Sequence, residues 1–403
     1  MGACLGLALG SALNIYTLSL FGPPLIEEFG WTKAQFALVS SLSLISLFFI
    51  PFVGRFVDLM GPRVAGIIGY IAVPSSFFAF SLMSGDITEF YAITLVKNVL
   101  GVLTTSLVFC RIVVERFDVA RGMALSVAMT GPPLVGAIAA PIIGEVIDSE
   151  GWRAAYRLLS LVSFAGGMVA MVLIGLRKAK PQEEPDAAPK RKPAPLTRQE
   201  FFALARQPAF PLLVAGMFLI NFPQVIVSSQ MKLVLYESGA ASSFATWLLS
   251  LFAISVIVGR FVCGYALDRV QPHLVAVAAL GMPAIGLFAL ASPFDASWLL
   301  IGAVALTGLA QGAEGDVGAM LTSRKFALHH YSFIYSFVMA SMGAATAVGS
   351  LVLSFMLHRT DSYDGFLVLA GVVTLAGVAC FHFIGRYGRS ELPEPRVPAP
   401  QSA

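Results

Sequence analysis

One arginine stands inside a long apolar stretch of the sequence. Residues 256–273 read VIVGRFVCGYALDRVQPH, with Arg260 in the apolar part and Asp268 where that part stops. At 1.5 Å of rise per residue, about 12 Å of helix separates the two. If Asp268 marks a membrane surface, Arg260 lies deep in a hydrocarbon core about 30 Å thick, where a guanidinium usually faces a partner or a wet cavity. A guanidinium binds a carboxylate through two parallel hydrogen bonds, so Arg260 is a candidate site for an organic anion. The alternative is a structural ion pair with an acid on a neighbouring helix.

Three further charged residues interrupt apolar runs. Lys97 is a candidate second cation in the same cavity, and the alternative is a lysine whose ammonium reaches the outer surface. Glu314 and Asp316 are two residues apart in a glycine-rich run, so they point to nearly opposite sides of a helix. One of them could pair with Arg260 or carry a coupling proton. The alternative is a helix-packing role together with the glycines.

Uncharged polar groups in the apolar runs are weaker candidates for substrate contact. They are Asn14, Tyr16, Gln224 and Tyr335. Pro223, next to Gln224, is expected to break its helix and to free backbone carbonyls for a ligand. Interior polar residues also serve simply as hydrogen bonds between helices, and that alternative stays open for each of them.

Composition identifies the elements that must position these residues. Hydrophobic residues make up 57% of the 403 residues and charged residues only 12%, against about 25% charged in soluble domains. This predicts an all-α membrane protein. Apolar runs long enough to span a bilayer recur twelve times. They lie at 2–21, 34–53, 64–83, 90–113, 122–145, 157–176, 209–232, 244–266, 273–292, 298–321, 332–356 and 365–385.

Other classes of function find little support in the sequence. The net charge of +3 is too small to indicate nucleic-acid binding, and the four cysteines include no CxxC pair, so neither a disulfide framework nor a metal site is expected. The GxxxxGK[ST], HExxH and GxSxG motifs are missing from the sequence. We therefore expect no enzyme activity and no cofactor.

A long polar break divides the chain into two halves. Residues 177–208 are rich in Pro and charge, which is typical of a linker, and 198–206 within them reads as a short interfacial amphipathic helix. The predicted domains are a six-helix bundle at 1–176, this linker, a second six-helix bundle at 209–386 and a disordered tail at 387–403. Most of the 26 Lys and Arg residues fall on the side of the linker and both termini, so the positive-inside rule places that side in the cytoplasm. The expected location is the plasma membrane, or the inner membrane of a bacterium.

A short pattern repeats between the halves. Gly54 and Asp58 follow the second apolar run, and Gly264 and Asp268 follow the eighth, each in an expected cytoplasmic turn. Two six-helix halves in parallel repeat imply a pseudo-twofold axis, with a binding site between the halves near the membrane midplane.

At this point the chain resembles the major facilitator superfamily over its whole length. Its loop signature GxxxD-[RK]-x-G-[RK]-[RK] is matched at four positions of the first copy and at three of the second. They are Gly54, Asp58, Gly61 and Arg63, then Gly264, Asp268 and Arg269. The resemblance implies twelve transmembrane helices and a role for these residues in closing the cytoplasmic side. A carboxylate at a helix end can accept hydrogen bonds in one state and lose them in the other.

Within the superfamily, the chain looks most like monocarboxylate porters and oxalate/formate antiporters. The resemblance is carried by EEFGWTKAQFALVSSLS at 27–43, GAEGD at 312–316 and HRTDSYDGF at 358–366. It implies that Arg260 occupies the position of the arginine that binds the substrate carboxylate. The chain departs from these families at two positions, with Val256 in place of a common aspartate and Tyr16 in place of a first-helix lysine. It also has no lysine between 332 and 356, where the antiporters use one. A single cation suits a monoanion better than a dianion.

The sequence therefore predicts a secondary transporter of a small monocarboxylate or related organic anion, working by alternating access. The expected partners are that small molecule, membrane lipid and, if coupling is to protons, protons carried by Glu314 or Asp316. One alternative is a proton-driven exporter of amphipathic drugs or metabolites. Another is a sensor or scaffold that does not transport, although that role usually needs an added soluble module.

Overall fold

The computed structural model describes residues 2–106, 108, 109, 112, 127–175, 206–293, 296–326 and 331–387, some of them as backbone only. This part of the chain is helical and contains no strand. The predicted linker from 177 to 205, with most of its interfacial helix, and the tail from 388 lie outside the described residues. The division into domains at these boundaries therefore stays a prediction.

The N-terminal half, residues 2–175, consists of helices joined by short turns. They are α1 (Gly2–Leu9), α2 (Ser11–Phe29), α3 (Lys33–Ala37), the 3₁₀ turn η1 (Leu38–Leu42), α4 (Ser43–Met60), α5 (Pro62–Phe80), α6 (Ile87–Gly101), the 3₁₀ turn η2 (Val102–Thr104), α9 (Gly131–Glu150) and α10 (Trp152–Gly175). Local sequence explains two of the boundaries. Thr32 and Gln35 form the reciprocal hydrogen bonds of a capping box at the start of α3. Gly61, at φ +82°, joins α4 to α5, which begins with Pro62.

The C-terminal half, residues 206–387, repeats this plan. Its elements are α12 (Ala209–Asn221), the π-helical turn η3 (Ile226–Gln230), α13 (Met231–Glu237), α14 (Ser242–Leu267), α15 (Pro272–Leu290), α16 (Ser297–Lys325), α17 (Tyr331–Thr360) and α18 (Asp364–Ile384). The expected break in the seventh span is present, because α12 ends two residues before Pro223 and the π turn follows it. A proline has no N–H to continue the helical hydrogen-bond ladder, which explains the position of the break.

Ten helical segments of the described chain are long and apolar enough to cross a membrane. Neither α4 nor α16 is among them. The 29-residue α16 carries Gln311, Glu314 and Asp316, which lower its hydropathy, and it packs extensively against α14 and α15. The all-helical membrane architecture is confirmed, while the full number of twelve spans stays a prediction.

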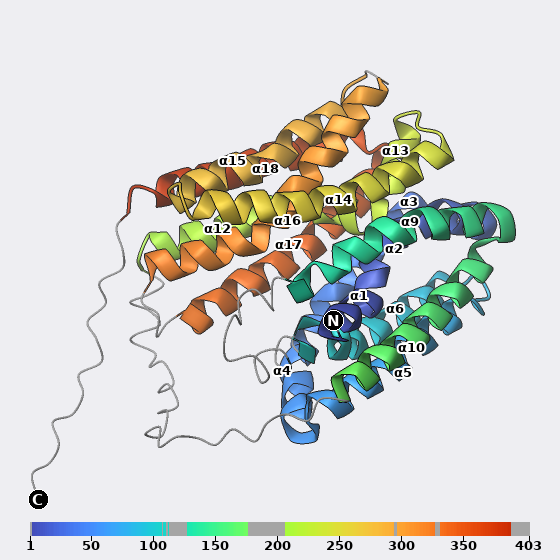
Figure 1. Cartoon of the computed structure of the whole chain (residues 1–403). Helices are drawn as coiled ribbons and strands as arrows, with labels where there is room; N and C mark the ends of the chain where they lie inside the picture. Colours follow the sequence, from blue (N-terminus) through green and yellow to red (C-terminus); the bar gives the residue numbers. More distant parts are fainter. Residues whose placement is uncertain are drawn as a thin grey trace, which may run out of the picture.

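The two halves meet at one end of the molecule and separate at the other. We call the end that carries the neighbours of the linker, Gly175 and Arg206, the linker side. At the opposite end, buried residues of both halves share a single apolar core, for example Phe36 with Leu235 and Leu353. On the linker side each half has its own core, around Phe109 in one and Phe326 in the other. Figure 1 shows the helices diverging toward the linker side, so among the described residues the halves are packed together at one end, here called the closed end, and apart at the other, here called the open end.

Two expectations about boundaries are wrong. The first apolar run was expected to end at residue 21, but helix α2 continues to Phe29, where Gly30 ends it in a left-handed conformation. The loop signature was expected to lie in turns, but Gly54 and Asp58 are in α4, and Gly264 is in α14. Helix α4 continues through Asp58 and ends only before Gly61, whereas α14 continues through Gly264 and ends at Leu267, just before Asp268.

Candidate functional site

Arg260 lies between the two halves. It belongs to α14, and its Nη1 donates a hydrogen bond of 3.2 Å to the backbone oxygen of Met129, just before α9. The Nε of Arg260 is buried and has no hydrogen-bond partner in the described chain. The side chain as a whole is partly exposed. Because a guanidinium has five N–H donors, several remain for a ligand.

The charge of Arg260 acts on two groups from different helices. They are the Tyr16 hydroxyl on α2 and the Asp316 carboxylate on α16. No carboxylate of the described residues lies within 4.0 Å of the guanidinium, so Arg260 makes no direct ion pair there. Tyr16 belongs to the N-terminal half, and its ring packs near that of Phe252 in the C-terminal half, with 6.4 Å between ring centroids. The arrangement is a cation at the boundary of the halves, with a phenol and an acid in its surroundings.

Lys97 is at another place in the molecule. It is 2% exposed, and its Nζ lies 5.9 Å from the centre of the Phe80 ring, inside the N-terminal half. The side chain does not reach the outer surface, and no contact with Arg260 is found among the described residues. Asn14 is also buried in α2, while Tyr335 packs against the linker-side core of the C-terminal half. The structure therefore groups Tyr16 with Arg260 but leaves Lys97, Asn14 and Tyr335 elsewhere.

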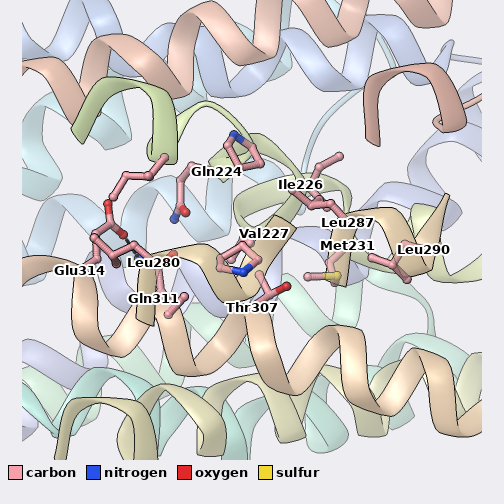
Figure 2. Close-up of a pocket in the computed structure, with 14 residues that line it drawn as sticks. Gln224, Ile226, Val227, Met231, Leu280, Leu287, Leu290, Thr307, Gln311 and Glu314 are labelled. Carbon is pink, nitrogen blue, oxygen red and sulfur yellow. Dashed lines mark hydrogen bonds between the residues drawn. The ribbon is translucent and has the colours of Figure 1, made fainter. Parts of the chain in front are cut away.

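A pocket inside the C-terminal half contains two other candidates. It has about 520 Å³ of empty space, open space at its mouth included, and its wall comes from the region between α12 and α13, from α15 and from α16. Gln224 and Glu314 both line it. Figure 2 shows Gln224 directed from the broken seventh span toward the face of α16 that carries Gln311 and Glu314. Arg260 does not line this pocket.

Glu314 is only 6% exposed. Its Oε2 accepts a hydrogen bond of 3.0 Å from Gln311 Nε2, and the amide of Asn221 lies beside the carboxylate. Its Oε1 is buried without a partner in the described part of the chain. The two acids of α16 thus lie in different surroundings, with Glu314 in the pocket and Asp316 near Arg260, as expected for residues two apart on a helix.

The gate residues lie at the open, linker side. Asp268 caps the C-terminus of α14 and is exposed, and Arg269 stacks on the Tyr265 ring at 3.6 Å. Arg63 is exposed in the first turn of α5. The side chain of Asp58 lies outside what the structure describes. With the linker side open, the expected interhelical closing contacts of Asp268 are not formed among the described residues.

Sequence reasoning missed two residues of the pocket. Thr307 and Gln311 line it together with Glu314. The signal was present in the spacing, because residues i, i+4 and i+7 share one face of a helix. This polar stripe of Thr307, Gln311 and Glu314 stands on a helix that reads mainly as small and apolar.

Comparison with known proteins decides the family. A family model described as Major Facilitator Superfamily matches residues 4–237 and 213–403, which together cover nearly the whole chain. The chain belongs to the major facilitator superfamily. It is accordingly a multi-pass membrane protein of a transporter family, as its sequence predicted.

Curated relatives of this superfamily member have low sequence identity to it but align with most of the chain. A fujikurins efflux protein of Gibberella fujikuroi is 26% identical over 359 residues, covering 87% of this chain and 73% of the relative. Monocarboxylate transporter 11 of Homo sapiens is 24% identical over 383 residues, covering 92% of this chain and 78% of the relative. A hexuronate transporter of Bacillus subtilis is 24% identical over 300 residues, covering 66% of this chain and 65% of the relative.

Solved structures share the fold at low identity. A D-xylose–proton symporter superposes with a TM-score of 0.72 at 14% identity, covering 95% of both chains. A bacterial homologue of the human lysosomal transporter Spinster, in an inward-facing and occupied conformation, gives 0.70 at 15% identity, covering 96% of both chains.

Proposed function

We propose that this superfamily member is a secondary transporter of a small organic monocarboxylate, and that Arg260 binds the carboxylate. One observation carries the proposal. Arg260 lies where the two halves meet, partly exposed, with a backbone oxygen as its only hydrogen-bond partner in the described chain. A partly buried guanidinium with no carboxylate hydrogen-bonded to it has unused donors, which an anionic solute would satisfy.

The surrounding groups fit a monoanion. Tyr16, from the opposite half, is near enough for the charge of Arg260 to act on its hydroxyl, and in the proposal this hydroxyl donates to the carboxylate that Arg260 holds. Lys97 lies elsewhere, so a second cation for a dianion is missing from the described surroundings of Arg260. Asp316 supplies a nearby negative charge that balances Arg260 when no substrate is bound and that favours release of the anion.

The mechanism is alternating access about this site. The conformation described here is open at the linker side. In the proposal this side faces the cytoplasm and the protein lies in the plasma membrane, in agreement with the positive-inside distribution of Lys and Arg. A carboxylate bound between α14 and the N-terminal half would bring the halves together, and Asp58, Asp268 and their neighbours would then close that side. Proton coupling, with Glu314 or Asp316 as the carrier, remains part of the proposal.

The names of two relatives agree with an anionic substrate. Monocarboxylates and hexuronates both carry a carboxylate, and these are the solutes named for the human and Bacillus subtilis proteins. The alternative of export of amphipathic compounds is favoured by the fungal efflux relative and by the mainly apolar wall of the pocket in the C-terminal half. An exporter of neutral or cationic compounds should not depend on Arg260.

Uptake into proteoliposomes tests the proposal. The measurement is the uptake of radiolabelled lactate, pyruvate, a hexuronate and a lipophilic cation by purified wild type, Arg260→Ala and Arg260→Lys. We expect Arg260→Ala to lower carboxylate uptake by at least about 30-fold, since truncating one member of a buried charge pair costs about 2–5 kcal/mol. Arg260→Lys should recover part of the activity, because it restores the charge without the planar fork.

The matched control is Arg359→Ala, which removes an exposed arginine that stacks on Phe355 at the closed end. This variant should transport like wild type. Undiminished carboxylate uptake by Arg260→Ala would refute the proposed role of Arg260, and transport of the lipophilic cation alone would favour the exporter.

A further inference from the structure

The pocket in the C-terminal half has a mainly apolar wall, but its polar part, at Gln224, Gln311 and Glu314, has the chemistry of a cation site. It contains one carboxylate, Glu314, and no basic side chain belongs to its wall. No cationic group of the described residues lies within 4.0 Å of that carboxylate. Leaving an ionised, buried carboxylate without a positive partner costs several kcal/mol, so the ionised form calls for a cation in the pocket.

The hydrogen bonds around Glu314 leave oxygen atoms for such a cation. Thr307 donates its hydroxyl hydrogen to the backbone oxygen of Ala303, at 2.8 Å, and lies about two helical turns before Glu314, too far to share an ion with it. Gln311 uses its Nε2 to hold Glu314 Oε2, which leaves its own amide oxygen as an acceptor. Glu314 Oε1 has no partner among the described residues.

The opposite wall adds further acceptors. Gln224 reaches into the pocket from the broken seventh span, and its amide forms no hydrogen bond within the described chain. The π turn that follows Pro223 interrupts the regular helical ladder beside it. Interrupted transmembrane helices of this kind commonly present oxygen ligands to Na⁺ or protons.

We propose that this pocket binds Na⁺, held by Glu314 Oε1 and the amide oxygens of Gln311 and Gln224. Several oxygen ligands with one negative charge suit a hard monovalent cation. A proton on Glu314 would cancel the charge but would leave the amide oxygens of Gln311 and Gln224 without a partner. The site is distinct from Arg260 and lies on another face of α16, so one helix carries both a cation site and, through Asp316, a neighbour of the anion site.

Thermal unfolding of the full-length protein in detergent tests this proposal without any substrate. Midpoints would be measured in NaCl and in choline chloride at equal ionic strength and constant pH. We expect NaCl to raise the wild-type midpoint by roughly 2–5 °C in a saturable manner, because a ligand that binds only the folded state stabilises it. The Glu314→Gln variant should lose this shift, and Gln224→Leu should need about ten times more Na⁺ for the same shift.

The matched control is Asp316→Asn, which changes the other acid of α16 and should keep the full response to Na⁺. Equal wild-type midpoints in the two salts would overturn the proposal, as would a shift that persists in Glu314→Gln. A response to pH alone that Glu314→Gln abolishes would also overturn it, since the carboxyl would then take a proton and no Na⁺. If Glu314→Gln failed to fold, an unchanged Na⁺ requirement in Gln224→Leu would overturn the proposal instead. None of these outcomes depends on Arg260, so the two proposals can fail separately.

Discussion

Lys33 and Glu237 are 204 residues apart in sequence, yet Lys33 Nζ lies 2.8 Å from Glu237 Oε2. The pair joins the start of α3 in one half to the end of α13 in the other. Lys33 Nζ also donates to the backbone oxygen of Asp361, and Glu237 Oε1 accepts from Ser362 Oγ and from the backbone N–H of Tyr363. One ion pair thus connects three interhelical connections at the closed end of the molecule.

We predict that Lys33→Glu weakens closure at this end. The substitution replaces an attraction with a repulsion and removes the bond to Asp361. Since partly exposed ion pairs contribute up to about 1 kcal/mol, the population open at this end should rise about fivefold. The measurement is the rate at which a maleimide labels Ser40→Cys, which lies at the contact between the halves, in a background without the four native cysteines.

Arg153 offers a matched control for this prediction. It forms an ion pair with Glu28 that is more exposed than the pair of Lys33 and Glu237, and both of its residues belong to the N-terminal half. Arg153→Glu should leave the labelling rate unchanged, and the double exchange Lys33→Glu with Glu237→Lys should restore it. If Arg153→Glu accelerates labelling as much as Lys33→Glu, the pair of Lys33 and Glu237 does not specifically hold the halves together.

A second prediction concerns Ser40 and Ser229, whose hydroxyl oxygens are 3.0 Å apart across the same contact. Cysteines at both positions should form a disulfide, since the side chains already meet at the required separation. Oxidation should then hold the protein closed at this end and abolish transport, and a reducing agent should restore it. Each single cysteine variant serves as a control that oxidation should not inhibit. Full transport by the oxidised double variant would show that this end need not open.

A third prediction rests on the close approach of α14 and α16. A Cβ atom added at Gly312 would lie 2.1 Å from the backbone oxygen of Val256 and 2.7 Å from the backbone nitrogen of Arg260. Gly312→Ala should therefore force the helices apart and cost about 1–3 kcal/mol of stability, measured as a lower unfolding midpoint in detergent. At Gly315, on the same helix, a Cβ would meet nothing within 4 Å, so Gly315→Ala should be neutral or slightly stabilising. Equal midpoints for the two variants would contradict the observed packing.

Hydropathy and local motifs predicted much of the fold, because both depend on residues close together in sequence. The capping box at Thr32 and the break at Pro223 are examples, since each is determined within a few residues. The limits of α2 were less predictable. Its last turn contains Glu27 and Glu28, which hydropathy alone excludes from a span, whereas Glu28 is held there by Trp152 and Arg153 from α10.

The candidate site was harder to assemble from sequence, because it depends on how helices are rotated against one another. From the sequence, Lys97 could face a cavity or the outer surface. In the structure it is buried within the N-terminal half, with its ammonium over the Phe80 ring. The acceptor of Arg260 is a backbone oxygen, which leaves no signature in the sequence. Gln224 and Glu314 come from different spans, and only the packing of those spans brings both to one pocket.

The last prediction separates the two acids of α16 by their effects on transport. Asp316 is close enough for the charge of Arg260 to act on it, whereas Glu314 lies in the pocket that Arg260 does not reach. If Arg260 binds the substrate, Asp316→Asn removes the charge that competes with the bound carboxylate. The KM for the carboxylate should then fall about 3- to 10-fold, and kcat should fall as well, because release of a tightly held anion is slower.

Glu314→Gln keeps the surroundings of Arg260 intact, so its KM measured at saturating Na⁺ and fixed pH should stay within about twofold of wild type, whatever happens to kcat. Initial rates of uptake into proteoliposomes over a range of substrate concentrations give both constants. A KM that rises in Asp316→Asn would mean that Asp316 orients Arg260 and does not compete with the substrate, and the assignment of the two faces of α16 would have to be revised.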